Sequence, residues 1–230
     1  MIIRILNNLL TALKGQEYNI DPRISVIYLI RLVFRRLTMF IRGKISFVSN
    51  KGLLFIGRDT QIRAKEKIHL GRGVTIDDGA FLDALSTNGV VMGDNVSVGK
   101  NTAIECTGSL KLLGHGMLVG DNVGLGRDCF YGCAGGIRIG DDTIIGNYVS
   151  FHSENHNSTD LQIPIRLQGV NHKGIVVGNN CWLGAKATIL DGAIIHDGCI
   201  IAAGCLVTAG EYLSNGIYGG VPAKLIKRRV

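Results

Sequence analysis

Aliphatic residues recur at every sixth position along most of the chain, and this spacing is its dominant pattern. The longest series is Val177, Leu183, Ile189, Ile195, Ile201, Val207 and Leu213. Shorter series come earlier: Ile56–Ile62, Leu70–Ile76, Met92–Leu110, Leu113–Ile137 and Ile139–Phe151. A period of six fits neither the 3.6-residue period of a helix nor the two-residue alternation of a half-buried strand. It predicts a coil with three short flat faces, about 18 residues per turn, whose stacked turns bury one aliphatic column.

The cysteines follow the same register. Cys181 and Cys199 are 18 residues apart, so they would stack in successive turns of the column. The chain has six cysteines, but it has no C-x-x-C pair and no recognisable secretory signal peptide. We therefore expect free thiols that pack as small apolar side chains in a reducing compartment, with the cytoplasm as the default.

The repeat resembles that of the hexapeptide-repeat acyltransferases over residues 52–230. The resemblance implies an all-β fold, a left-handed parallel β-helix. Its hand comes from the resemblance alone, because parallel crossovers are otherwise almost always right-handed. We expect a basic, helical segment at residues 1–51, the β-helix at 52–214 with a protruding loop at 152–174, and a short basic tail at 215–230.

The hexads stop between Phe151 and Ile175, and the chain then resumes the coil in phase. Long excursions from a rigid scaffold are common places for function. Here the chain resembles the sugar O-acetyltransferases, including the galactoside and maltose enzymes, at Asn155-His156, Ile163-Pro164-Ile165, Gln168-Gly169 and Cys181-Trp182-Leu183-Gly184. The resemblance implies that His156 is the general base, a task that suits an imidazole near neutral pH. His152 and His172 match no catalytic position and are weaker candidates for acceptor binding.

The same resemblance implies acetyl-CoA as co-substrate and no bound metal. The donor contacts that it implies are Trp182, Ala185, Ala203, Thr208, Lys224 and Arg228. The alanines would line the pantetheine arm, Trp182 would shape the site or simply plug a corner, and the basic tail would reach the phosphates. The tail follows Gly219-Gly220-Val221-Pro222-Ala223, which is similar to the family's ending.

The acceptor side departs from the galactoside and maltose enzymes. Gly126 and Ala134 stand where those enzymes have Asn and Asp that hold the sugar. The acceptor is therefore expected not to be a simple galactoside or maltoside. Arg127 and Asp128 are candidate replacements, with ordinary solvent-facing coil residues as the alternative.

The net charge of +7 is confined to the N-terminal segment. Residues 1–51 hold nine basic and two acidic residues, whereas residues 52–230 hold sixteen of each sign. A β-helix body without net charge argues against nucleic-acid binding. With 32 glycines, only 3 prolines and no three-residue period, the composition also excludes a collagen-like chain.

Residues 25–43 have a helical pattern in which Arg31, Arg35 and Arg42 lie near one face. Spanning a bilayer would place arginines in its interior, which is costly. Two interpretations stay open: an interfacial helix on an anionic membrane surface, or a helix that caps the open first coil.

These observations predict a cytoplasmic, acetyl-CoA-dependent O-acetyltransferase that acts on a sugar hydroxyl in capsule, exopolysaccharide or lipopolysaccharide synthesis. The resemblance implies a homotrimer with sites between neighbouring β-helices, and an acceptor that is a sugar, a sugar nucleotide or a lipid-linked sugar. A serine O-acetyltransferase is an alternative, although its helical domain is hard to fit into residues 1–51. A γ-type carbonic anhydrase lacks support because His152 and His156 do not have the H-x₄-H spacing. A non-catalytic β-helix scaffold is the remaining alternative.

Overall fold

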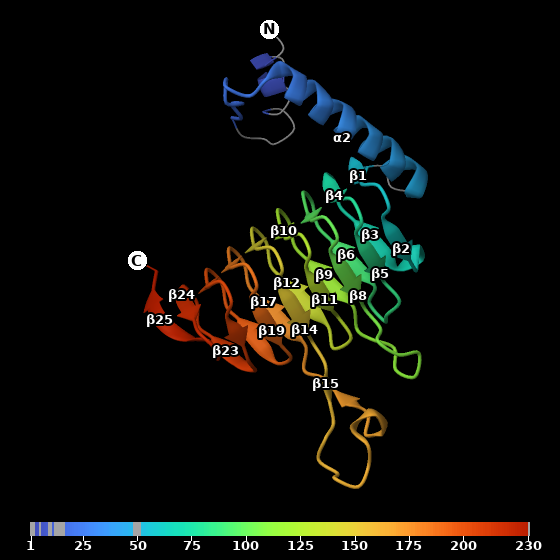
Figure 1. Cartoon of the computed structure of the whole chain (residues 1–230), viewed down its shortest axis with the longest axis vertical. Helices are drawn as coiled ribbons and strands as arrows, with labels where there is room; N and C mark the ends of the chain where they lie inside the picture. Colours follow the sequence, from blue (N-terminus) through green and yellow to red (C-terminus); the bar gives the residue numbers. More distant parts are fainter. Residues whose placement is uncertain (1–2, 5, 9–10, 12–16, 48–51, 230) are drawn as a thin grey trace.

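The computed structural model describes residues 3–4, 6–8, 11, 17–47 and 52–229. Within these residues, parallel strands form the three long sides of a prism, here called sheets A, B and C (Figure 1). Sheet A contains β1 (Leu54–Ile56), β4 (Val74–Ile76), β7 (Ser97–Val98), β10 (Gly124–Leu125), β13 (Ile144–Ile145), β18 (Trp182–Leu183), β21 (Ile200–Ile201), β24 (Gly216–Gly219) and β25 (Lys224–Arg228). Sheet B contains β2 (Gln61–Arg63), β5 (Phe81–Asp83), β8 (Ala103–Glu105), β11 (Phe130–Gly132), β14 (Ser150–His152), β19 (Thr188–Leu190) and β22 (Leu206–Val207). Sheet C contains β3 (Ile68–Leu70), β6 (Val90–Met92), β9 (Met117–Val119), β12 (Ile137–Ile139), β17 (Ile175–Val177), β20 (Ala193–Ile195) and β23 (Gly210–Tyr212).

Each turn of the chain visits sheets A, B and C in that order and then climbs to the next turn. The register shows this directly, because Ile144 pairs with Trp182, and Trp182 pairs with Ile200 in the following turn. Cys181 and Cys199 therefore stack, as their spacing predicts. The chain forms the left-handed parallel β-helix that the resemblance to the hexapeptide-repeat acyltransferases implies. Sheet A continues past residue 214, since β24 pairs with β21 and β25 then pairs antiparallel with β24.

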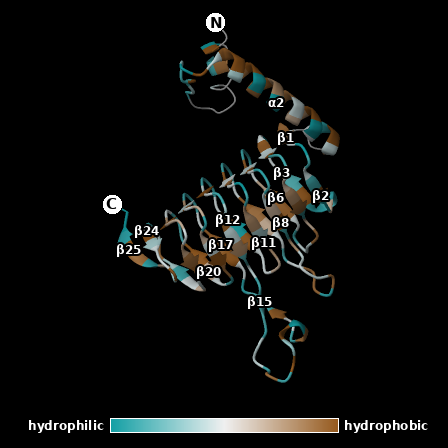
Figure 2. Ribbon diagram, in the orientation of Figure 1, coloured by the Kyte–Doolittle hydropathy of each residue, from teal (hydrophilic) through white to brown (hydrophobic). Residues whose placement is uncertain are grey.

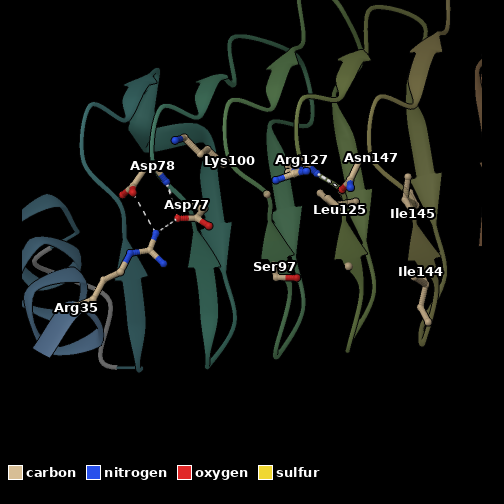
Figure 3. Close-up of a pocket in the computed structure, with 13 residues that line it drawn as sticks. Arg35, Asp77, Asp78, Ser97, Lys100, Leu125, Arg127, Ile144, Ile145 and Asn147 are labelled. Carbon is tan, nitrogen blue, oxygen red and sulfur yellow. Dashed lines mark hydrogen bonds and ion pairs between the residues drawn. The ribbon is translucent and has the colours of Figure 1, made fainter. Parts of the chain in front are cut away.

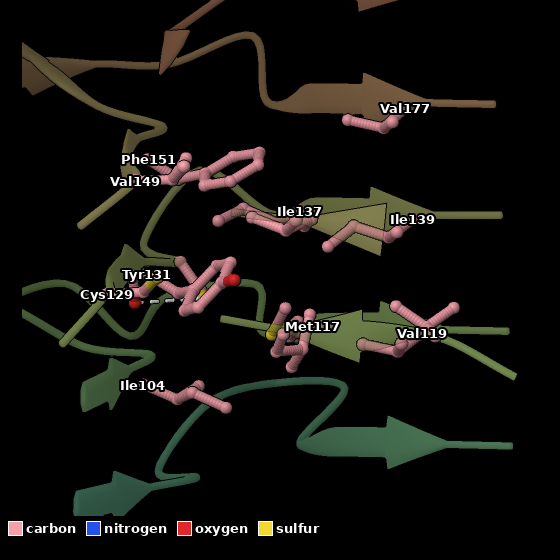
Figure 4. Close-up of a cluster of buried hydrophobic side chains, with 14 of the residues drawn as sticks. Ile104, Met117, Val119, Cys129, Tyr131, Ile137, Ile139, Val149, Phe151 and Val177 are labelled. Carbon is pink, nitrogen blue, oxygen red and sulfur yellow. Dashed lines mark hydrogen bonds between the residues drawn. The ribbon is translucent and has the colours of Figure 1, made fainter. Parts of the chain in front are cut away.

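Most hexad residues fill the interior as one apolar column (Figure 4), and many of the strands that carry them are hydrophobic in Figure 2. Leu213, the last residue of the longest series, is an exception at 50 % exposed. Tyr131 and Phe151 are fully buried in adjacent turns of sheet B, and their rings stack with centroids 5.0 Å apart. The six cysteines are all buried and free, as expected. They act as small apolar side chains of the core.

The corners of the prism explain why glycine and Asp or Asn recur in the hexads. At the corner from sheet C to sheet A, the Asp141 carboxylate accepts the Asp121 backbone N–H of the turn below at 2.7 Å, and Asn179 accepts that of Asp141 at 2.8 Å. A Cβ on Gly120 would overlap Asp141 Oδ1, so this corner needs glycine before the polar residue. The result is a ladder of hydrogen bonds that fixes the stacking of successive turns.

The hexad series fails between β8 and β9. The sequence pattern places Leu110 and Leu113 in the column, but both lie in a loop at residues 106–116, and Leu110 is 89 % exposed. The chain leaves the coil after Glu105 and returns at Met117. The spacing of these leucines is therefore coincidental, and the β-helix has a second excursion that the pattern does not reveal.

Helix α2 (Val26–Ser46) covers the first turn of the coil (Figure 1). Phe40 packs against Phe55 with ring centroids 6.2 Å apart, and Arg42 Nε donates to the Ile56 carbonyl at 2.9 Å. Gly43 lies directly on Leu54, where a Cβ would overlap the Leu54 carbonyl oxygen. The interpretation of this segment as a cap on the open end of the coil is confirmed. The described part of the chain contains no helix whose length and apolar character would suffice to cross a bilayer.

Candidate functional site

A hairpin projects from the β-helix at the corner between sheets B and C, here called the BC corner (Figure 1). It leaves the coil after β14 and returns at β17. Within it, β15 (Asn155–His156) pairs antiparallel with β16 (Val170–Asn171), and the short 3₁₀ helix η2 (Ile165–Leu167) lies beyond them. His156 pairs with Val170, and its side chain is exposed. The hairpin therefore presents an accessible imidazole on a defined piece of backbone.

A buried carboxylate anchors this hairpin. Asp191 is 4 % exposed and lies at the BC corner of the next turn, between β19 and β20. Its Oδ1 accepts the backbone N–H groups of Lys173 and Gly174, each at 2.8 Å. Its Oδ2 accepts the Asn155 side-chain amide at 3.1 Å. Both ends of the hairpin are thus tied to one anion, immediately beside His156.

The other histidines of the hairpin have separate surroundings. His172 meets His115 of the loop at residues 106–116 in an edge-to-face contact with ring centroids 4.7 Å apart. His152 lies over Phe130, with centroids 5.6 Å apart. Neither ring contact involves His156. The structure thus sets His156 apart from the other two histidines by its place on β15.

Two of the expected donor residues share one corner, between sheets A and B, here called the AB corner. Ala185 and Ala203 follow β18 and β21 in successive turns, and the Gly204 N–H donates to the Ala185 carbonyl at 2.9 Å. Ala203 is exposed and Ala185 is half-buried, so these two corner positions, here called the alanine track, carry only methyl groups. Trp182 lies close by on the outer face of sheet A and is 53 % exposed, so it does not act as a buried plug.

Thr208 lies apart from these alanines. It follows β22, at the BC corner, where its backbone N–H donates to the Tyr212 hydroxyl at 3.1 Å and its carbonyl accepts from that hydroxyl at 3.2 Å. In one copy of the chain Thr208 is therefore on the hairpin's side of sheet B, across from Ala185 and Ala203.

The basic tail forms β25 along the last edge of sheet A. Lys224 pairs with Gly219 and Arg228 with Gly216, and both side chains are exposed. Arg229 is used differently, because its guanidinium donates to the Gly198 carbonyl at 2.7 Å. Arg229 therefore fastens the strand to the coil, while Lys224 and Arg228 stay accessible to a ligand.

A groove of about 510 Å³, lined by both polar and apolar residues, extends along the AB corner toward α2 (Figure 3). Lys100, Arg127 and Asn147 line it from consecutive turns, and Asn147 Oδ1 accepts the Arg127 backbone N–H at 3.2 Å. Asp128 accepts the Asn101 side-chain amide at 3.0 Å, and its other carboxylate oxygen lies 4.0 Å from Nε of Arg127. Of the two candidate replacements on the acceptor side, only Arg127 lines the groove.

Sequence reasoning missed Asp191, Lys100 and Asn147. The sequence does carry a signal for Lys100 and Asn147. Like Arg127, each directly follows a hexad glycine, which is the position that Ala185 occupies after Gly184. Asp191 carried no such signal, because its role depends on where the hairpin returns to the coil. Within the described ranges, no group of three His, Cys, Asp or Glu residues is arranged to hold a metal ion.

Comparisons with known proteins agree with this architecture. The family described as bacterial transferase hexapeptide (six repeats) matches residues 174–209. WbbJ of Escherichia coli K12, named as a lipopolysaccharide biosynthesis O-acetyl transferase, is 29 % identical over 174 residues, which cover 73 % of this chain and 74 % of that protein. Rv3034c of Mycobacterium tuberculosis, named as an acetyltransferase, is 28 % identical over 79 % of this chain, which spans only 52 % of that protein.

Among solved structures, a mutant of the N-acyltransferase AntD from Bacillus cereus, in complex with dTDP-4-amino-4,6-dideoxyglucose and coenzyme A, superposes with a TM-score of 0.54. The match covers 82 % of this chain and 89 % of that chain at 18 % identity. At this identity the similarity establishes the shared fold.

Proposed function

We propose that this chain belongs to the hexapeptide-repeat acyltransferases and is an O-acetyltransferase that transfers the acetyl group of acetyl-CoA to a sugar hydroxyl. The observation that carries the proposal is the anchored hairpin, which holds the exposed His156 beside a rigid β-helix. The similarity to proteins named as acetyltransferases, one of them of lipopolysaccharide biosynthesis, supports the reaction and the class of acceptor. Synthesis of a capsule, exopolysaccharide or lipopolysaccharide in the cytoplasm is the setting that fits best.

In this reaction His156 acts as the general base. Its neutral imidazole takes the proton of the acceptor hydroxyl while the oxygen attacks the thioester carbonyl carbon. A C–O bond forms, and the C–S bond of the collapsing tetrahedral intermediate breaks. The imidazolium then returns the proton to the leaving thiolate, which departs as coenzyme A. A positioned base of this kind contributes about 10²–10⁴-fold to the rate.

The donor residues suit coenzyme A by their chemistry. The small Ala185 and Ala203 leave room along the AB corner for a narrow pantetheine arm, with Trp182 beside it. Lys224 and Arg228 supply accessible positive charge for the phosphates at the C-terminal end. Thr208 would contribute from the BC corner of the copy that supplies the hairpin.

His156 and the alanine track lie at opposite edges of sheet B in a single chain. A complete site therefore needs the hairpin of one copy next to the AB corner of another. This arrangement supports a homotrimer with its sites between neighbouring β-helices, in which each copy supplies one half of two sites.

The groove on the acceptor side of the proposed site carries both signs of charge, since Asp77 and Asp78 line it together with Arg35, Lys100 and Arg127. Lys100 and Arg127 stand one turn apart in the groove on the same corner as Ala185 and Ala203. A sugar nucleotide or a lipid-linked sugar diphosphate carries the phosphates that such cations bind. A lipid-linked acceptor would bring the chain to the inner face of a membrane, where residues 25–43 supply peripheral contact.

Calorimetric titration of acetyl-CoA into the wild-type chain and into His156→Ala tests the proposal without knowledge of the acceptor. We expect both to bind acetyl-CoA with similar affinity, and only the wild type to release coenzyme A at an appreciable rate with a panel of sugar nucleotides and glycans. His69→Ala, at an exposed position on β3 in the first turn of the coil, is the control and should retain activity. A folded wild type that binds no acetyl-CoA would leave the non-catalytic scaffold as the better interpretation.

Mixed trimers test the shared site. His156→Ala removes the base, and Ala203→Trp fills the exposed alanine track, so each variant alone should be inactive. When the two variants are co-expressed in equal amounts, a site is active only if one copy supplies His156 and its neighbour supplies Ala203. Random mixing meets both conditions at about a quarter of the sites, so about a quarter of the wild-type activity should return. Ala203→Ser, which leaves the track open, should stay active. No recovery in verified mixed trimers would mean that the site is not shared.

A further inference from the structure

The outer face of α2 is apolar, and no residue that the structure describes covers it. Leu29, Met39 and Gly43 form the buried side that faces the rest of the chain. The opposite side exposes Val26, Ile27, Ile30, Val33, Phe34, Leu37, Ile41 and Ile45. At 3.6 residues per turn these eight side chains occupy a sector of about 120° along the whole helix. Ile27 and Phe34 are each 66 % exposed, which is costly in water.

Arginines follow one edge of this apolar face. Arg31, Arg35 and Arg42 recur at helical spacing along the boundary between the exposed apolar sector and the coil. Arg35 pairs with Asp77 and Asp78, and Arg42 donates to a backbone carbonyl, so these two hold the helix on the coil. Arg31 is exposed, and its guanidinium has no ion pair or hydrogen bond within the residues that the structure describes.

A cavity of about 500 Å³ lies at this boundary. Ile30 and Phe34 form its apolar side, and Arg31 of the helix and Arg58 of the first turn of the coil form its cationic side. The Asp78 carboxylate also lines the cavity, where it is paired with Arg35 at 3.1 Å. The Arg58 guanidinium likewise lacks a partner in the described part of the chain, although its backbone N–H donates to Asp78. The cavity therefore joins an apolar surface to two unpaired guanidinium groups, which bind phosphate oxygens well.

We propose that α2 docks the chain on a bilayer of anionic phospholipids, with its apolar face in the interface and with Arg31 and Arg58 on a headgroup phosphate. The choice of occupant rests on charge complementarity, since the whole net charge of +7 lies in residues 1–51 and the β-helix body has none. The hairpin with His156 projects away from α2, so docking leaves it accessible (Figure 1). The inference refines the membrane contact within the proposed function, but its test does not depend on acetyl transfer.

Flotation of the full chain with phosphatidylcholine vesicles, with and without about 30 % phosphatidylglycerol, measures the contact. We expect at least tenfold stronger binding to the anionic vesicles, and a loss of most of this difference in high salt. Arg31→Glu with Arg58→Glu should weaken binding to anionic vesicles at least tenfold, since each removed cation costs about fivefold. Arg138→Glu with Arg166→Glu makes the same charge change at exposed positions on sheet C and the hairpin, and should have a much smaller effect.

The double variant Ile27→Gln with Phe34→Gln tests the apolar face and should lower binding to both kinds of vesicle. Leu118→Gln with Leu161→Gln is the control, because it makes the same kind of change at exposed positions on sheet C and the hairpin. Circular dichroism verifies that every variant is folded. A folded wild type that does not float with anionic vesicles overturns the proposal. A second result would also overturn it: the wild type binds no vesicles, and the double variant Ile27→Gln with Phe34→Gln changes the oligomeric state. The apolar face would then be covered by a second copy of the chain. Acetyl-CoA titration of the same proteins shows separately whether the proposed transferase chemistry stands.

Discussion

The side-chain amide of Asn155 donates to the buried carboxylate of Asp191 over 3.1 Å, and this contact joins the base of the hairpin to the coil of the next turn. The same carboxylate accepts two backbone N–H groups, from Lys173 and Gly174, in the segment that leads from β16 back to β17. Hydrogen bonds to an ionised acceptor are stronger than those between neutral groups. His156 follows Asn155 directly, so the direction in which its imidazole is presented depends on this anion.

Asp191→Asn should therefore impair catalysis without removing the donor site. The amide keeps one acceptor oxygen, but its NH₂ group faces donors that the carboxylate satisfied. We expect kcat to fall about 10–100-fold, because small misplacements of a catalytic group are costly, while the KM for acetyl-CoA stays within about twofold. Steady-state kinetics at saturating acceptor separate the two constants.

Asp197→Asn is the matched control for this change. Asp197 accepts the Asn179 backbone N–H at the corner from sheet C to sheet A, where Asn179 itself serves the same purpose one turn below. An amide is thus already used in that ladder, and kcat should be unchanged. If Asp191→Asn matched the wild type in kcat and in hydrogen exchange of residues 155–174, Asp191 would have no positioning role.

Lys224→Glu should weaken acetyl-CoA binding about tenfold in low salt and less in high salt. The side chain is exposed on β25, where a charge reversal perturbs no buried contact. Screening by salt reduces the difference, because the Debye length falls to about 8 Å at physiological ionic strength. Calorimetric titrations at two salt concentrations measure it. Lys65→Glu, at the opposite end of the β-helix, is the control, and equal affinities for the two variants would take the tail out of the donor site.

The six cysteines should not react with a thiol reagent in the native protein at pH 8. All are buried, and burial raises the pKa of the Cys181 thiol to about 11, so its reactive thiolate is scarce. A hydrogen bond with Cys133 lowers the pKa of the Cys106 thiol, but Cys106 is fully buried, so a reagent cannot reach it in the folded protein. Titration with a chromogenic disulfide should count no fast thiols in the native state and six in denaturant. A fast native thiol would show that the column opens at that turn.

The sequence predicts the β-helix well because its core is repetitive. Each hexad residue, such as Leu183 or Ile189, meets the same neighbours in the turns above and below, so periodicity carries nearly all the information about packing. The hairpin is predicted because it breaks that period. Leu110 shows the limit, since a leucine in a loop can match the spacing by chance and still be exposed.

The site is less accessible to sequence reasoning because it depends on contacts between turns. Asp191 is 36 residues from Asn155, and nothing in its own hexad distinguishes it from other corner residues. Likewise, Thr208 lies apart from Ala185 because the two residues occupy different corners of the prism. The hexad spacing alone does not say which corner a residue occupies, since that depends on the sheet to which the preceding strand belongs. The resemblance to a family names Ala185 and Thr208 together as donor residues, but in the fold they lie at different edges of the prism.

The contact between α2 and the coil should be weakened by acid through Asp78. Burial opposes its ionisation, but the Arg58 backbone N–H and the Arg35 guanidinium outweigh this and lower the pKa of the carboxyl below its usual value. A carboxyl with a lowered folded-state pKa contributes stability that is complete above the unfolded-state pKa, near 3.9, and is lost as the pH falls through the folded value.

Asp78→Asn should therefore lower the free energy of unfolding by about 1 kcal/mol at pH 7, a modest value because the pair is partly exposed. Urea unfolding from pH 7 down to pH 3 should show this difference shrink below about pH 4, whereas Asp160→Asn on the exposed hairpin should lie close to the wild type throughout. A difference that stayed constant over the whole range would mean that the amide perturbs packing rather than charge.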